Sequence, residues 1–188
     1  MGEPPDDPAR AVLDALTRAA HDKRSAMRWP VLATAVPDGG AEARILVVRH
    51  FDREARIIEF HTHKGSEKVA ALRADPGCEL LFFDKSSMVQ LRVSGTASVH
   101  TDDETADAAW ARAPKTSWPD YAGPDPGQPL KGAESWDPGE DGETARKGFA
   151  AIRIRVEHAD RLKVARDGHV RHAVDFSGDE PEAQRLTP

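Results

Sequence analysis

The chain begins with one amphipathic pattern and continues as a series of short apolar runs. In residues 9–20, Val12 and Leu16 recur at helical spacing, so they would share one face of a helix. Pro8 precedes them, where the first turn would lie, and proline is tolerated there because its missing N–H would be unpaired in any case. We therefore predict a helix within residues 1–24.

After this helix, the apolar residues form short runs or alternate with polar residues, which is the pattern of strands. Turn-forming glycine, proline and aspartate separate the runs, and this spacing predicts antiparallel hairpins. Ser66 is a good N-cap for one short helix, and Thr101 with Glu104 forms a capping box that opens another. The predicted strands are residues 31–36, 42–51, 55–62, 78–83, 88–99, 149–165 and 169–176.

These elements predict a mainly β (α+β) fold. Seven or eight short strands at hairpin spacing, with only three helices, favour an antiparallel barrel with a few peripheral helices. Strand and helix do not alternate regularly, which argues against a parallel, doubly wound sheet. We expect a single domain, residues 1–188. Within it, residues 114–148 contain six prolines and no periodic apolar face, which predicts a long loop.

Composition and charge argue against several classes of partner. The formal net charge is -6, whereas binding to nucleic acid requires a basic face. No apolar run approaches the roughly 18 residues that a membrane span needs. Cys78 is the single cysteine, so neither an internal disulfide nor a cysteine-rich zinc site can form. The acidic start, MGEPPDDPAR, does not resemble a signal sequence, and together these features predict a cytoplasmic protein.

Basic and hydroxyl side chains gather around the predicted helix that starts at Ser66. Lys68 lies in its first turn, Thr62 lies in the strand before it, and Arg44 and Arg49 flank an earlier apolar run. A helix N-terminus presents unpaired N–H groups and about half a positive charge, so it is a natural seat for a phosphate. The residues alone leave two interpretations open: a phosphomonoester site, or an ordinary solvated and capped helix.

Three histidines on neighbouring predicted strands suggest a metal site as an alternative. His61 and His63 would lie on one face of a strand, and His50 ends the strand before it. No acidic or cysteine residue has a matching spacing, so we predict no metal. The chain also lacks the glycine-rich motifs of dinucleotide-binding and P-loop proteins.

Several short motifs follow one another in order from Arg44 onwards. They read Arg-x-x-x-x-Arg, Phe-x-Thr, Ser-x-Lys and Gln-x-Arg-Val-x-Gly, and they comprise Arg44, Arg49, Phe60, Thr62, Ser66, Lys68, Gln90, Arg92, Val93 and Gly95. Together with the ending AQRLTP, this order resembles the pyridoxamine 5'-phosphate oxidase-like flavoproteins. The resemblance extends from about Val31 to Pro188 and implies an antiparallel FMN-binding split β-barrel.

The resemblance implies an FMN site assembled from several elements. Arg44 and Lys68 fall on phosphate-binding positions, and residues 45–48 would contact the flavin ring through their backbone. His61 and Thr62 match a Tyr-Thr pair that lines the cofactor. The implied cofactor-binding set is Arg44, Ile45, Leu46, Val47, Val48, Arg49, His61, Thr62, Ser66, Lys68, Gln90, Gln128 and Arg171.

Two of these positions rest on weaker matches. Gln128 lies near the place of a cofactor contact, and an equal alternative is that it only satisfies backbone groups of the loop. Near the C-terminus, Leu162 and HVRHAVD stand where the family has a Trp and an Arg-x-His-x-Arg, and Arg171 is the residue that could serve there.

In that family, two FMN sites lie at the interface of a homodimer, so the resemblance also implies a homodimer. The apolar runs ILVV and ELLFF are nearly continuous, which suggests that both faces of these strands are covered.

The substrate site departs from the family pattern. Glu67 occupies a position where the oxidase has an arginine beside the phosphate-binding lysine. Ala109 and Ala113 fall where a tyrosine and an arginine hold the substrate phosphate. The substrate contacts that remain implied are Arg49, Lys115 and Ser117.

Two functions from different classes therefore remain. The first is an FMN-dependent oxidoreductase or oxidase that acts on an unidentified small molecule. The alternative is a non-catalytic split barrel that binds a flavin or haem. The incomplete substrate clamp keeps the alternative open, and the sequence does not distinguish FMN from a deazaflavin.

Overall fold

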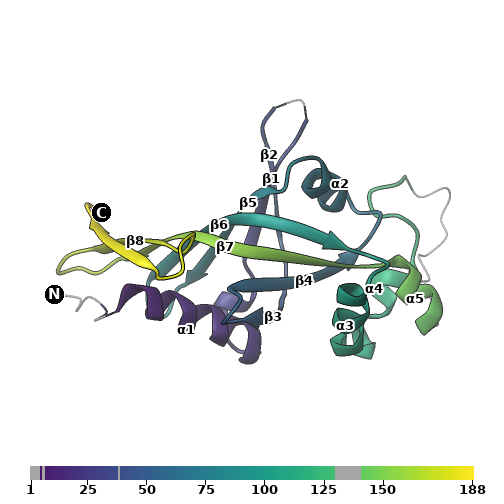
Figure 1. Ribbon diagram of the computed structural model, residues 1–188, viewed down its shortest axis with the longest axis horizontal. Helices are drawn as coiled ribbons and strands as arrows, with labels where there is room; N and C mark the ends of the chain where they lie inside the picture. Colours follow the sequence, from purple (N-terminus) through teal and green to yellow (C-terminus); the bar gives the residue numbers. More distant parts are fainter. Residues whose placement is uncertain (1–4, 6, 38, 130–140) are drawn as a thin grey trace.

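The computed structural model describes residues 5, 7–37, 39–129 and 141–188, and within these ranges nine strands form one antiparallel sheet (Figure 1). The strands are β1 (Val31–Ala35), β2 (Ala41–Ile45), β3 (Val48–Asp52), β4 (Ile57–His63), β5 (Gly77–Asp84), β6 (Val89–His100), β7 (Phe149–Lys163), β8 (Val170–Asp175) and β9 (Glu182–Leu186). The helices are α1 (Pro8–His21), α2 (Glu67–Ala74), α3 (Glu104–Arg112), α4 (Pro119–Ala122) and α5 (Gly142–Gly148), with short 3₁₀ turns η1 (Ala26–Arg28) and η2 (Lys115–Ser117).

The sheet curls strongly without closing. Its main path runs β2-β1-β5-β6-β7-β4-β3, and β8 and β9 extend from β7. Strands β2 and β3 stand at opposite ends of this path, yet only Leu46 and Val47 separate them in sequence. The two ends must therefore come close together, as they do in a split barrel. The predicted fold class is confirmed.

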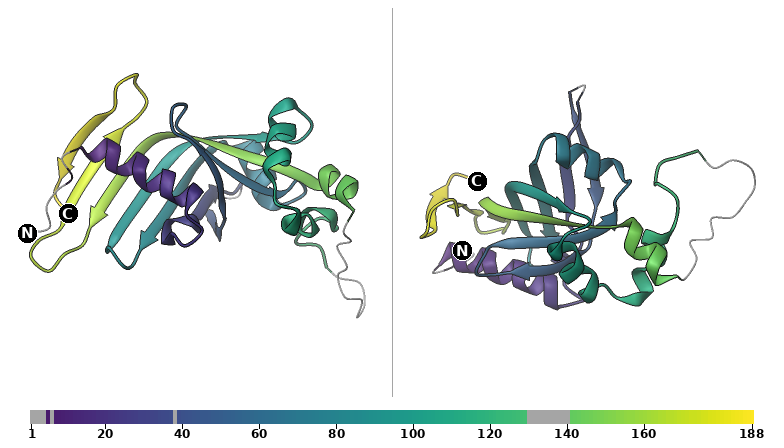
Figure 2. Two further views of the ribbon diagram at one scale, coloured as in Figure 1. Left: turned by 90° about the horizontal axis from the view of Figure 1, so that it is seen from below. Right: turned by 45° about the vertical axis from the view of Figure 1, so that its right-hand side comes forward.

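Strand β7 is the longest strand and pairs with three others, β4, β6 and β8. Its first half pairs with β4 and its second half with β8, while β6 runs along its other edge (Figure 2). The register shifts at Gly95, where a side-chain Cβ would overlap the carbonyl oxygen of Arg155. This close approach of the two backbones explains the glycine of the Gln-x-Arg-Val-x-Gly motif.

The core lies on one face of this sheet. Val89, Leu91 and Val93 are buried, while the intervening Gln90 and Arg92 lie on the opposite, outer face, as their alternation predicts. Helix α1 covers the inner face near β3 and buries Val12, among other residues. Its N-cap Asp7 accepts a hydrogen bond from the N–H of Arg10.

The prediction of one strand over residues 42–51 was wrong. The chain leaves β2 after Ile45, the N–H of Leu46 donates to the carbonyl of Pro30, and β3 begins at Val48 on the far edge of the sheet. The apolar run continues without interruption from the end of β2 through the connection into β3, so it carries no mark of the transfer.

The prediction of a long loop over residues 114–148 was also wrong in its described part. Helices η2, α4 and α5 fall within it, and residues 130–140 lie outside the described residues. Tyr121 is 2% exposed and meets Phe149 edge-on at 5.2 Å between ring centroids. Trp110 stacks on Trp118 at 5.1 Å. These aromatic contacts replace the periodic apolar face that the sequence lacks.

One predicted helix cap is wrong, and the other is at its predicted position but makes no capping bond. Asp103, not Thr101, is the N-cap of α3, and its carboxylate accepts from the N–H of Ala106. Ser66 does occupy the N-cap position of α2, but its hydroxyl makes no capping bond and lies 3.4 Å from the hydroxyl of Thr62. Its side chain is therefore directed toward the candidate phosphate site. In the described ranges, no helix is long and apolar enough to cross a membrane.

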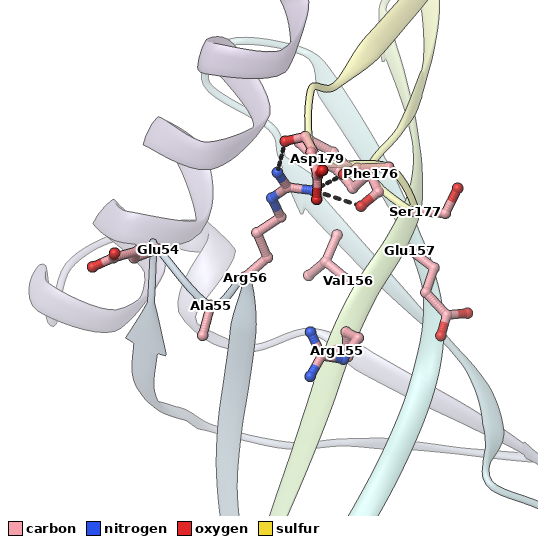
Figure 3. Close-up of a pocket in the computed structure, with 10 residues that line it drawn as sticks. Glu54, Ala55, Arg56, Arg155, Val156, Glu157, Phe176, Ser177 and Asp179 are labelled. Carbon is pink, nitrogen blue, oxygen red and sulfur yellow. Dashed lines mark hydrogen bonds between the residues drawn. The ribbon is translucent and has the colours of Figure 1, made fainter.

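Arg56 fastens the connection between β8 and β9 to the β3–β4 turn. Its guanidinium donates to the carbonyls of Phe176 at 2.6 Å, Gly178 at 2.8 Å and Asp179 at 2.6 Å (Figure 3). These residues line a cavity of about 400 Å³, and Arg155 lies in the same wall.

Replacing Arg56 with alanine should lower the free energy of unfolding by about 2–3 kcal/mol, because charge-assisted bonds to three carbonyls are lost. Urea unfolding measures the change. Arg155→Ala is the matched control, since no hydrogen bond of its guanidinium is seen within the described structure. Equal losses for the two variants would contradict the anchoring role of Arg56.

Candidate functional site

Four polar residues meet where β4 leads into α2, and we call them the Lys68 cluster: Arg44, Thr62, Ser66 and Lys68. The Lys68 ammonium donates to the Thr62 hydroxyl at 3.2 Å. Thr62 is 8% exposed and Ser66 3% exposed, so both hydroxyls are withdrawn from solvent. The strand–turn–helix order of the sequence produces the grouping of Thr62, Ser66 and Lys68, because only the short turn at 64–66 separates the end of β4 from the first turn of α2.

The Lys68 cluster carries positive charge that its own residues do not neutralise. Burial lowers the pKa of Lys68, and the nearby charge of Arg44 lowers it further, while the charge of the adjacent Glu67 partly opposes this decrease. Arg44 is itself paired with Glu42 at 2.7 Å and donates to Thr34 at 2.7 Å. Within the described part of the chain, Lys68 forms no ion pair. A half-buried ammonium without a counter-ion, beside two hydroxyls, fits a bound phosphate.

Glu67, the acidic departure from the family pattern, points toward the loop that carries Gln128. A Cβ built on Gly127 would lie 3.3 Å from a Glu67 carboxylate oxygen. The neighbouring Gly65 is packed against Asp125 of the same loop. This segment therefore covers the start of α2, and the exposed side chain of Gln128 belongs to it.

A second group of polar side chains lies between the sheet and α4, and we call it the Arg49 cluster: Arg49, Ser117 and Tyr121. Arg49 donates to the Ser117 hydroxyl at 3.2 Å. The Nε of Arg49 and the hydroxyl of Tyr121 are buried without a hydrogen-bond partner. Burial raises the pKa of Tyr121, and the Arg49 charge and the approach of the Arg49 and Ser117 side chains to the hydroxyl partly oppose that rise, although neither contact has the geometry of a full hydrogen bond.

The charge of Arg49 also affects Arg28, which lies outside this cluster. Burial lowers the pKa of Arg28, and Arg49 adds to that decrease. Arg28 donates to the carbonyls of Ala19 and Ala20, whereas the Nε of Arg49 has no partner among the described residues. Two guanidinium groups near each other, one with an unpaired donor, fit an anionic ligand group. The structure thus brings together Arg49 and Ser117, two of the three predicted substrate contacts. The third, Lys115, places its ammonium 5.5 Å from the centre of the Trp118 ring.

A hydrogen-bonded trio of Glu59, His61 and Arg112 lies close to the Arg49 cluster; the side chains of Glu59 and His61 are buried, whereas that of Arg112 is 45% exposed. Glu59 is 2% exposed, and Arg112 donates to both of its carboxylate oxygens at 2.9 Å. The Nε2 of His61 lies 3.0 Å from Glu59. Burial alone would raise the pKa of Glu59, but the hydrogen bonds from His61 and Arg112 prevail and hold it below its usual range.

His61 is a neutral donor in this arrangement. Burial lowers its pKa more strongly than the hydrogen bond that it donates to Glu59 raises it. Because a carboxylate only accepts, Nε2 carries the proton, and Nδ1 is left as a buried acceptor without a partner. A donor on a bound ligand would satisfy it.

His61 and Thr62, which were predicted to line the cofactor, point to opposite faces of β4. Successive residues of a strand point to opposite faces, so Thr62 belongs to the Lys68 cluster while His61 joins Glu59. His63 shares the face of His61 and lies 3.1 Å from the carbonyl of Gly123. In the described ranges, no three His, Cys, Asp or Glu residues form a group that could hold a metal ion.

Two other predicted cofactor residues lie on the outer face of the sheet. Gln90 and Arg171 both align with Leu162 of β7, one on each side. Arg171 is already engaged, because it donates to Asp160 at 2.6 Å. Asp160 also accepts from Arg92 at 2.7 Å.

Residues 45–48 span the crossing from β2 to β3. Leu46 and Val48 are buried, whereas Ile45 is 64% exposed on the outer face, beside Val31. Val47 is partly buried.

Sequence reasoning missed Glu59, Arg112 and Tyr121. An acidic residue between Ile58 and Phe60 in a strand was an available signal for Glu59, since buried carboxylates require partners. Nothing local marks Arg112 or Tyr121, which reach the site through tertiary packing alone.

We next compared the chain with known protein families and sequences. The family model described as Pyridoxamine 5'-phosphate oxidase matches residues 16–162. A pyridoxine/pyridoxamine 5'-phosphate oxidase of Rubrobacter xylanophilus is 39% identical over 87 residues, which cover 46% of this chain and 39% of that protein. One from Bradyrhizobium diazoefficiens is 40% identical over 84 residues, 45% of this chain and 38% of that protein. The match thus spans well under half the length of these relatives.

Solved structures resemble the whole chain. A pyridoxamine 5'-phosphate oxidase-related, FMN binding protein from Nostoc punctiforme superposes with a TM-score of 0.77 at 21% identity, covering 97% of this chain and 98% of that one. PhzG from Burkholderia lata, crystallised with tetrahydrophenazine-1-carboxylic acid, gives 0.74 at 19% identity, covering 99% and 95%. At such identities the likeness establishes the fold.

Proposed function

The chain belongs to the pyridoxamine 5'-phosphate oxidase family, and from this premise we propose that it is an FMN-binding flavoprotein that oxidises or reduces a small molecule. The observation that carries the proposal is the Lys68 cluster, where a half-buried ammonium without a carboxylate partner faces two buried hydroxyls. Lys68 and Arg44 would hold the FMN phosphate. When bound, the flavin ring supplies the redox step, and the protein supplies position and electrostatics.

The remaining residues act around the ring and the substrate. Arg49 and Ser117 would hold an anionic group of the substrate, since the guanidinium has free donors and the hydroxyl is already aligned with it. Neutral His61 would accept a hydrogen bond at Nδ1. The aromatic layer of Trp110, Tyr121 and Phe149 would exclude water from this side. Calorimetric titration with FMN tests the proposal: saturable binding with one FMN per chain supports it, and no binding contradicts it.

We further propose that the protein works as a homodimer. Gln90 and Arg171 lie on the outer face, whereas Arg44 aligns with buried Leu32 on the inner face of β1 and β2. The sheet separates these groups within one chain, so a single FMN could meet both only with a second copy. Apolar side chains exposed on that outer face, Ile45, Leu81 and Phe83, supply a surface for it.

The dimer is expected to have twice the chain mass of 20.5 kDa in light scattering. Phe83 is 48% exposed, so Phe83→Glu should fold normally but lose dimerisation and bind FMN more weakly. Phe83→Leu is the control and should keep both properties. A wild-type protein that scatters as a 20.5 kDa monomer at micromolar concentration would sink the dimer proposal.

Pyridoxamine 5'-phosphate is expected to be a poor substrate. Ala109 is 0% and Ala113 9% exposed, so they offer the substrate phosphate neither a hydroxyl nor a guanidinium. Losing two such contacts should cost about 3–5 kcal/mol, or at least a few hundredfold in kcat/KM. Peroxide release and pyridoxal phosphate formation by FMN-loaded protein measure this. Turnover at the rate of a dedicated oxidase would refute the argument.

The same two alanines favour a second candidate function, a split barrel that binds flavin or haem without turnover. The two functions differ in whether a bound flavin, once reduced chemically, passes its electrons to an added small-molecule acceptor. A bound flavin that no acceptor or donor can reach would support the binding protein.

A further inference from the structure

A cavity of about 410 Å³ lies between α1 and the inner face of β6 and β7, and we call it the α1 groove. It is separate from the Lys68 cluster, because none of that cluster's residues line it, and α1 lies below the sheet in Figure 1 whereas α2 lies above it. Arg161 and Lys163 enter it from β7, where they align with buried Leu91 and Val89. Arg18 enters it from α1.

The three cations in the α1 groove have no acidic partner among the described residues. Two carboxylates also line the groove, but both are engaged elsewhere. Asp14 pairs with Arg53 at 2.8 Å and with Arg10 at 3.8 Å. Asp84 accepts hydrogen bonds from the hydroxyls of its neighbours Ser86 and Ser87, both at 2.7 Å.

Of the three cations, Arg161 gives the strongest indication of a missing anion. One of its terminal nitrogens, Nη1, is buried with no hydrogen-bond partner. Burial lowers the pKa of Arg161, and the charge of Arg18 lowers it further, which places two like charges close together. Arg161 is partly buried, lies close to a second guanidinium and has one N–H donor without a partner, and each of these features costs free energy. An anion bound between the two guanidinium groups would offset that cost.

The other walls of the groove indicate what kind of anion would fit. Met27 and Val89 offer apolar surface, and the volume lies within the range of small-molecule sites, roughly 300–1,000 Å³. Guanidinium forks match the oxygens of a phosphate with two parallel hydrogen bonds, and a third cation suits a dianion. We propose that the α1 groove is a binding site for a small phosphomonoester with an apolar body, held by Arg18, Arg161 and Lys163.

The probe for this site is phenyl phosphate, titrated by calorimetry into the full-length chain carrying Lys68→Ala. That background removes the candidate FMN phosphate site, so the outcome does not depend on whether FMN binds there. Binding should be at least about tenfold weaker in Arg161→Met, because a charge-assisted contact is lost while the apolar stem is kept. Lys23→Met is the matched control, since Lys23 is exposed and does not line the groove.

Thermal unfolding provides an independent measurement. Phenyl phosphate should raise the Tm of the parent and of Lys23→Met, but not that of Arg161→Met. Without ligand, Arg161→Met should be at least as stable as the parent, because it removes an unneutralised charge. Absence of binding in the parent at millimolar probe, or equal binding by parent and Arg161→Met, would overturn the proposal.

Discussion

Replacing Lys68 with alanine is expected to weaken FMN binding by about ten- to a hundredfold and to leave riboflavin binding nearly unchanged. The ammonium is half-buried and close to the charges of Arg44 and Glu67, and among the described residues it donates only to the Thr62 hydroxyl. A phosphate would gain a charge-assisted contact there, and such contacts are worth about 1.5–3 kcal/mol. Riboflavin has no phosphate, so the lysine has nothing to hold.

Lys64→Ala is the matched control for this experiment. Lys64 is exposed in the turn before α2. Its replacement by alanine removes one positive charge near the site, as Lys68→Ala does, but leaves the Lys68 cluster unchanged. Its effect on FMN should be less than about threefold, as for a screened surface charge. Fluorescence titration with both flavins measures all three proteins. An equal loss of FMN and riboflavin affinity in Lys68→Ala would remove the phosphate assignment.

Replacing Arg112 with alanine is expected to lower the free energy of unfolding at neutral pH by about 3–5 kcal/mol. Glu59 is 2% exposed, and both of its oxygens accept from Arg112. Without the guanidinium, an ionised carboxylate would stay buried with one neutral partner, His61. Urea unfolding at neutral pH is the measurement.

The effect of Arg112→Ala should depend on pH in a defined direction. The hydrogen bonds from His61 and Arg112 hold the pKa of Glu59 below its unfolded value, so this stabilisation is present above about pH 4.3 and is lost as pH falls through the folded pKa. The difference between variant and parent should therefore shrink in acid. Adding Glu59→Gln to Arg112→Ala should recover much of the loss. A full loss that persists in the double variant would show that Arg112 acts through packing instead.

The sequence predicted those features whose cause is local. The alternation in β6, the proline-bearing start of α1 and the approach of Thr62, Ser66 and Lys68 all depend on neighbours within a few residues. The break between β2 and β3 could not be predicted, because a continuous apolar run serves either one strand or two.

Features that depend on distant partners were not predictable in the same way. Arg112 meets Glu59 across 53 positions in sequence, and Arg49 meets Ser117 across 68. The Arg49–Ser117 contact was anticipated only because the family resemblance assigned both residues to one ligand. Tyr121 lies in a proline-rich segment without periodicity and is buried because Phe149 supplies the facing ring.

The most direct test of the central claim is the visible absorption spectrum of the protein after incubation with FMN and removal of free ligand by gel filtration. The protein peak is expected to keep the absorption bands of oxidised flavin, with one FMN per chain, and Lys68→Ala, treated identically, is expected to lose most of them. A wild-type peak without flavin absorption at saturating FMN would contradict the account.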